Sequence, residues 1–136
     1  MKSPVIGYRV SGNDVLRILK KLTKRNFKND HAKMKLTDLY KQDGEILDKC
    51  NVVYFKSPNS FTGEDVCEIF IHGSPLIASQ LEQTLKDFKI QNLRLAKKGE
   101  FSYRSVLNSK NSLKQAKAIN SIINNDSFSS LEYNKK

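Results

Sequence analysis

Residues 66–72 form the pattern that most restricts the folds open to this chain. Their side chains alternate between the two sides of an extended strand. One side carries Cys67, Ile69 and Ile71, and the other carries Val66, Glu68, Phe70 and His72. A helix start follows directly, because Ser74 is a suitable N-cap and Pro75 fits the first helical turn. A strand that leads straight into a helix predicts layers of sheet and helices.

Strand and helix patterns alternate along the rest of the chain. Strands are predicted at residues 5–10, 32–36, 45–55 and 93–95, and helices at 15–22, at 75–88 and from Asn111 or Ser112. The turn signal Asp43-Gly44 predicts that the second and third of these strands form a hairpin. Residues 97–104 are predicted to form a loop, and the chain is expected to fray from Asn124. This order predicts an α+β fold with a mixed β-sheet and flanking helices.

The composition fits one small domain and argues against several classes of protein. The chain has 136 residues, of which 38% are hydrophobic, enough for one modest core. It contains no run of about 18 apolar residues and no secretory signal, so a membrane association is not expected. Cys50 and Cys67 lack the spacing of a zinc site or disulfide scaffold, and His31 and His72 lack metal-ligand partners. A reducing cytoplasm fits best, and no metal site is expected.

Positive charge is concentrated in the first third of the chain. Residues 1–36 carry ten lysines and arginines but only two acidic residues, whereas the whole chain has a net charge of +10. Such a basic surface can attract phosphate, and RNA is its natural partner. The alternative is an ordinary solvated surface, since 19 of the 24 basic residues are lysine, a bias typical of AT-rich coding.

Two charged residues lie within apolar strand patterns. A carboxylate at Glu68 is costly to desolvate unless it is paired. It is therefore either open to water or an acceptor for the N–H groups of a heterocycle. Arg9 needs a carboxylate partner, from the protein in a salt bridge or from a ligand. His72 is expected to be a packed or capping residue rather than a catalytic one, and Cys67 a small core residue.

Four motifs occur in order along the chain. They are Arg9-Val10-Ser11-Gly12; the segment from Pro58 to Gly73; Gly99-Glu100-Phe101-Ser102 with Arg104, Leu107 and Asn108; and Leu113, Gln115, Ala116 and Ile119. They resemble the R-I-S-G, P-N-S-F-T-G-E-D-V-x-E-x-x-x-H-G-G, P-G-E-F-S/T-x-R-A-F-L-N and D-L-x-Q-A-E-A-I motifs of one family, the N-terminal domain of the tRNA-modification GTPases called MnmE or TrmE. The second motif is long and specific, and the resemblance extends from about residue 3 to about residue 125.

This resemblance implies a fold and a function. The family's domain is similar to the folate-binding domain of glycine-cleavage aminomethyltransferases, forms a homodimer and binds a tetrahydrofolate derivative, 5-formyl- or methylene-tetrahydrofolate. With an FAD-dependent partner called MnmG or GidA, the whole family protein adds an aminomethyl-type group to carbon 5 of the wobble uridine in certain tRNAs. Binding of tRNA by this chain is a possible further property.

The resemblance also implies which residues bind the cofactor. By position in the motifs, the folate-contacting arginine, glutamate and lysine of the family fall on Arg9, Glu68 and Lys110. Glu68 would accept hydrogen bonds from the pterin, while Arg9 and Lys110 would hold carboxylate or carbonyl oxygens. Residues 1–110 would form the folate-binding and dimerisation domain. Residues 111–136 would contain the first helix of a truncated helical domain and a frayed tail.

The sequence also departs from the family pattern. An upstream strand is missing, Ser74 replaces a glycine, and no G-x-x-x-x-G-K-S/T phosphate-binding loop is present. This chain is therefore expected to resemble a truncated family member that has no GTP site and no catalytic residue of its own. The alternatives are a stand-alone basic RNA-binding module and an inactive remnant.

Overall fold

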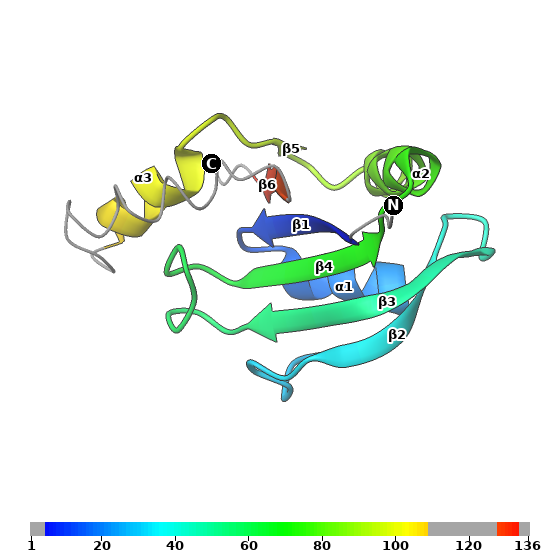
Figure 1. Cartoon of the computed structure of the whole chain (residues 1–136). Coiled ribbons are helices and arrows are strands. Elements are labelled where there is room, and N and C mark those ends of the chain that lie inside the picture. The colour runs from blue at the N-terminus through cyan, green and yellow to red at the C-terminus, as the bar shows by residue number, and fades with distance from the viewer. Residues whose placement is uncertain (1–4, 109–127, 134–136) are drawn as a thin grey trace.

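A computed structural model of the chain describes residues 5–108 and 128–133. In chain order its elements are β1 (Val5–Ser11), α1 (Val15–Thr23), β2 (Lys35–Tyr40), β3 (Ile46–Phe55), β4 (Val66–His72), α2 (Pro75–Asp87), β5 (Leu93–Leu95), α3 (Glu100–Leu107) and β6 (Phe128–Tyr133). The strands form one six-stranded sheet in the order β2-β3-β4-β1-β6-β5 (Figure 1). The predicted α+β class is confirmed.

The sheet is mixed, as predicted. Strands β2, β3, β4 and β1 pair antiparallel to one another, and β5 pairs antiparallel to β6. Only the pairing of β1 with β6 is parallel among the described strands. The hairpin around Gly44 is confirmed, and this glycine has the positive φ of 91° that a tight turn of this kind requires.

Helices α1 and α2 pack on one face of the sheet and form the core with it. Alternate residues of β4, including Ile69 and Ile71, are fully buried there. Helix α1 contributes Ile18 and Leu19 to the same cluster, and α2 contributes Leu81. The N-cap of α2 is confirmed, because the Ser74 side chain accepts a hydrogen bond from the Ile77 amide at 3.3 Å.

Helix α3 corrects one prediction. Residues 97–104 were expected to form a loop because of their glycine, yet Glu100–Leu107 is helical. Gly99 instead stands at the N-cap with a φ of 78°, so it starts a helix rather than interrupting one. In Figure 1, α3 (yellow) lies toward the left end of the sheet and α2 (green) toward the right.

Strand β2 corrects a second prediction. The strand expected at residues 32–36 begins only at Lys35, and Met34 and Leu36 are exposed. The buried residues of β2 are Thr37 and Leu39, which lie on the core face. The apolar residues that alternate here, Met34 and Leu36, therefore do not lie on the face that α1 and α2 cover.

The C-terminal segment corrects a third prediction for the residues that are described. Fraying was expected from Asn124, but residues 128–133 form β6 beside β1, with Gly7 opposite Phe128. This strand is defined by main-chain pairing with β1, which side-chain periodicity did not indicate. The helix predicted from Asn111 or Ser112 lies outside the described residues, and the domain boundary predicted at residue 110 stays a prediction.

Candidate functional site

Arg9 and Glu68 form an ion pair on the sheet face opposite the core. They stand directly across from each other on β1 and β4. The Nε and Nη2 atoms of Arg9 both lie 2.9 Å from Oε2 of Glu68. The side chains are only 11% and 17% exposed, respectively. The salt bridge considered for Arg9 is therefore present in the structure.

Two aromatic rings adjoin the Arg9 guanidinium. Its central carbon lies 4.6 Å from the ring centroid of Phe61 and 5.8 Å from that of Phe101. Both distances are within the range of cation–π attraction. Since both arginine nitrogens point to Oε2, the second oxygen of Glu68 accepts no hydrogen bond from the described residues. Within the described part of the chain, the pair thus leaves Oε1 of Glu68 without a hydrogen-bond donor.

The loop that carries the longest motif is held by its own polar groups. The Asp65 carboxylate accepts hydrogen bonds from the Ser57 amide at 2.9 Å and the Tyr54 hydroxyl at 3.1 Å. The Ser57 hydroxyl donates to the carbonyl of Gly63, and that of Ser60 donates to the carbonyl of Glu64. The Ser57–Pro58 peptide bond is cis. These contacts fix the main chain that presents Phe61 to Arg9.

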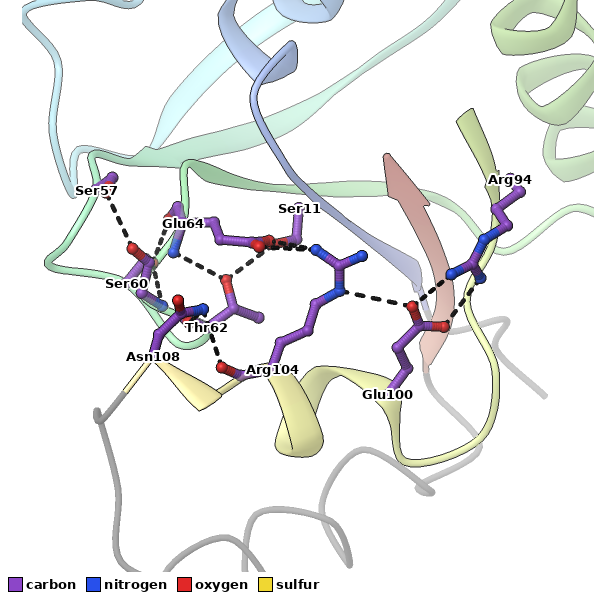
Figure 2. Close-up of polar contacts among 10 residues, drawn as sticks. Ser11, Ser57, Ser60, Thr62, Glu64, Arg94, Glu100, Arg104 and Asn108 are labelled. Carbon is purple, nitrogen blue, oxygen red and sulfur yellow. Dashed lines mark hydrogen bonds and ion pairs between the residues drawn. The ribbon is translucent and has the colours of Figure 1, made fainter. Parts of the chain in front are cut away.

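Glu64 joins this loop to β1 and α3 (Figure 2). Its carboxylate accepts a hydrogen bond from the Ser11 hydroxyl at 2.7 Å. Nη1 of Arg104 lies 2.9 Å from one Glu64 oxygen and 2.7 Å from the other. The side chains of Arg104 and Glu64 are 12% and 6% exposed. Asn108 adds a second link, donating to the carbonyls of Thr62 and Arg104.

The same chain of charges continues to β5. Arg94 donates to both oxygens of Glu100, at 3.0 and 2.7 Å, and Nε of Arg104 lies 3.5 Å from Glu100. Burial alone would raise the pKa of the Glu100 carboxyl. The hydrogen bonds from Arg94 and the Lys97 amide, with the charges of Arg94 and Arg104, outweigh burial and lower that pKa. Figure 2 shows Glu64, Arg104, Glu100 and Arg94 as one continuous row.

The remaining residues singled out in the sequence have different outcomes. Cys67 is fully buried, as predicted, and burial raises the pKa of its thiol. His72 is exposed rather than packed, and its Nδ1 lies 2.8 Å from Asp48, which also accepts a hydrogen bond from the His72 amide. Lys110 lies outside the described residues. The structure therefore brings together two of the three predicted cofactor-binding residues and describes nothing of the third.

Sequence reasoning missed the part played by Glu64 and Arg104. Each belongs to a motif, but the two residues are 40 positions apart. Membership of the motifs was the one available signal, since three of the four motifs meet in this cluster through Ser11, Glu64 and Arg104. The motif residues Glu64 and Arg104 therefore hold the loop at residues 57–65 against α3.

The fold and these contacts define an α+β domain that has a nearly buried arginine–glutamate pair on one sheet face and a row of ion pairs from Glu64 to Arg94. Comparisons with known proteins identify the family to which this domain belongs. A family model described as "GTP-binding protein TrmE N-terminus" matches residues 1–110. The chain therefore belongs to the TrmE N-terminal family, as its motifs predicted.

Several proteins named tRNA modification GTPase MnmE are similar to this chain. That of Helicobacter pylori (strain HPAG1) is 47% identical over 111 residues, which are 81% of this chain and 23% of the relative. Those of Rickettsia canadensis (strain McKiel) and Rickettsia bellii (strain OSU 85-389) are 42% and 46% identical over 90% of this chain and 27% of the relatives. The chain thus spans about a quarter of the length of the curated relatives it matches.

Helices long and apolar enough to cross a membrane do not occur in the part of the chain that the structure describes.

Proposed function

We propose that this chain is the tetrahydrofolate-binding, dimer-forming N-terminal domain of a tRNA wobble-uridine modification GTPase. Its role is to hold the one-carbon donor for an aminomethyl-type modification at carbon 5 of uridine. By itself it neither hydrolyses GTP nor completes the modification. The observation that carries the proposal is the Arg9–Glu68 pair, which lies beside two aromatic rings and in which one carboxylate oxygen accepts no hydrogen bond from the described residues.

The chemistry of a pterin matches this site. A pterin presents an amino group and ring N–H donors along one edge, and a fixed carboxylate accepts from such an edge. Oε1 of Glu68 has no hydrogen bond from the described residues, so it can accept one without breaking the pair. Phe61 supplies partly exposed apolar surface beside the guanidinium. When bound, the cofactor supplies the one-carbon unit, and Lys110 is proposed to hold its carboxylate or carbonyl oxygens.

Partners of the domain belong to the same proposal. We infer that it forms a homodimer and acts with an FAD-dependent MnmG or GidA-type protein in the cytoplasm. In this proposal, a contact with another protein surface covers Leu36 on β2 and Ile46 on β3, which are both exposed. Both cysteines are free and buried, which suits a reducing compartment.

Isothermal titration calorimetry with 5-formyltetrahydrofolate tests the folate site. We expect Glu68→Ala and Arg9→Ala each to lose about 1–3 kcal/mol of binding free energy, because a buried charged hydrogen bond goes unmade. Glu45→Ala is the control, since Glu45 pairs with Lys41 on the exposed hairpin. The absence of heat from the wild-type chain at millimolar ligand would contradict the folate site. Unchanged affinity in both variants would remove the residue assignment.

A second candidate function is RNA binding on the outer surface of α1. Residues Arg17, Lys20, Lys21, Lys24 and Arg25 are all exposed there. Helix α1 has no acidic residue in its first turn and two lysines in its last. A surface of one charge on one helix attracts a phosphate backbone.

Gel shifts at two salt concentrations separate the two functions. RNA binding predicts an affinity that falls steeply with salt, weakens in Arg17→Gln combined with Lys20→Gln, and survives Glu68→Ala. Lys97→Gln combined with Lys98→Gln is the matched control, because these lysines are exposed and lie on another segment. Neither folate nor RNA binding, together with a broad melt, would identify an inactive remnant.

A further inference from the structure

Arg9 depends for its surroundings on two segments that are distant in sequence. One ring against its guanidinium, Phe61, belongs to the loop at residues 57–65, and the other, Phe101, is a buried residue of α3. Arg9 lies on β1, which main-chain pairing holds in place independently of these rings. The position of the strand is therefore fixed by the sheet, whereas the position of the guanidinium also depends on where the loop and α3 lie.

Arg104 is the residue that joins this loop to α3. It lies three positions after Phe101 in α3, about one helical turn away, and its guanidinium contacts both oxygens of Glu64 in the loop. Glu64 in turn accepts a hydrogen bond from Ser11, two residues after Arg9 on the same strand. A lysine would keep the charge at this position, but it has one ammonium group in place of Nη1, which contacts Glu64, and Nε, which lies 3.5 Å from Glu100.

We propose that Arg104 is a positioning residue for the Arg9–Glu68 pair. By clamping Glu64, it sets the distance between α3 and the 57–65 loop, so that Phe61 and Phe101 hold the guanidinium in line with Oε2 of Glu68. The consequence for ligand affinity rests on the proposed function, because only a ligand that contacts Glu68 benefits from this alignment of the guanidinium. The alignment itself can be measured in the chain without a ligand.

This role differs from general stabilisation of the fold. Strands β1 and β4 stay paired through main-chain hydrogen bonds, and the core lies on the opposite face of the sheet. Loosening the contact between Arg104 and Glu64 therefore acts first on the two rings and on the Arg9 side chain. A readout at the Nε–H group of Arg9 detects this effect, whereas a purely structural role would leave that group as it is in any variant that folds.

Nuclear magnetic resonance of the full 136-residue chain supplies that readout. In the wild type, the Nε–H of Arg9 donates to Glu68 at 2.9 Å and is expected to exchange slowly with water. In Arg104→Lys we expect its exchange to become at least about tenfold faster, equivalent to about 1.4 kcal/mol of lost protection. Phe101→Leu keeps every ion pair but removes one ring, so it is expected to act in the same direction.

Arg94→Lys is the matched control. It makes the same substitution in the same row of charges, but Arg94 contacts Glu100 rather than the 57–65 loop. We expect little change at Arg9 in this variant. Unchanged Arg9 exchange in a folded Arg104→Lys chain, or an equal change in Arg94→Lys, would overturn the proposal. If Arg104→Lys does not fold, an unchanged exchange rate of the Arg9 Nε–H in Phe101→Leu overturns it instead.

Calorimetry with 5-formyltetrahydrofolate keeps this proposal separate from the proposed function. If the wild type binds, we expect Arg104→Lys to weaken affinity by about tenfold while Arg94→Lys does not. If the wild type does not bind, the proposed function fails, and the exchange measurement at Arg9 still decides whether Arg104 positions the pair.

Discussion

The two faces of the sheet are built by different kinds of interaction. On the core face, fully buried apolar residues such as Ile69 pack against α1 and α2. On the other face, the Arg9–Glu68 pair and the Glu64–Arg104 contact join loop, strand and helix. Apolar packing is nondirectional and tolerates substitutions of similar size. Buried charges require each partner, so the second face is the one where a single substitution changes a specific geometry.

Removing one charge of the second face should have the largest effect. Arg104→Ala removes the cation that contacts both oxygens of the buried Glu64 carboxylate, and we expect a loss of about 3–5 kcal/mol in the free energy of unfolding. Urea denaturation of the single and double variants checks this. The double variant Arg104→Ala with Glu64→Ala should recover part of the loss, because no unpaired charge remains. Strict additivity of the two single losses would show that the two residues do not act as a pair.

Truncating the core face should have a comparable or somewhat smaller effect. Ile69→Ala creates a cavity among residues that are fully buried, and we expect a loss of about 2–5 kcal/mol, measured by urea denaturation. No second substitution on the Arg9 face should recover it, since the cost is lost packing rather than an unpaired charge. Recovery of stability in Ile69→Ala by Glu64→Ala would contradict this separation of the two faces.

Acid should reveal the smallest effect, and only on the second face. The pKa of Glu100 is lowered in the folded chain, so its ion pairs contribute stability above the ordinary carboxyl pKa. That contribution is lost as the pH falls through the lowered pKa. Denaturation midpoints across the acid range should fall less steeply in Glu100→Gln than in the wild type. An identical slope in the two chains would mean that Glu100 does not contribute.

Local signals in the sequence were sufficient for much of the first face. The alternation at residues 66–72 and the cap at Ser74 predicted β4 and the start of α2, because each depends on neighbouring residues. Gly99 was misleading because it predicted a loop, whereas a glycine with positive φ can also stand at the N-cap of a helix. Met34 and Leu36 were misleading because apolar alternation does not reveal which face is covered.

The candidate site was only partly predictable for a different reason. Arg9 and Glu68 were identified as charges within apolar strands, which is a local signal. Their pairing depends on the register of two strands, because the two residues are 59 positions apart in the sequence. The contact between Glu64 and Arg104 depends in addition on where α3 packs, which no local pattern specifies. Ion pairs between residues far apart in the sequence can therefore be predicted only after the fold is known.

The place of β1 in the sheet has a consequence for synthesis on the ribosome. This first strand lies between β4 and β6, so both of its neighbours are made later. While the nascent chain emerges, β1 has two open edges, and the hairpin of β2 and β3 can form before it has any partner. Strand β1 therefore gains these two neighbours only after β4 and β6 have been made, so its pairing with them completes the sheet, whereas the β2–β3 hairpin can form without it.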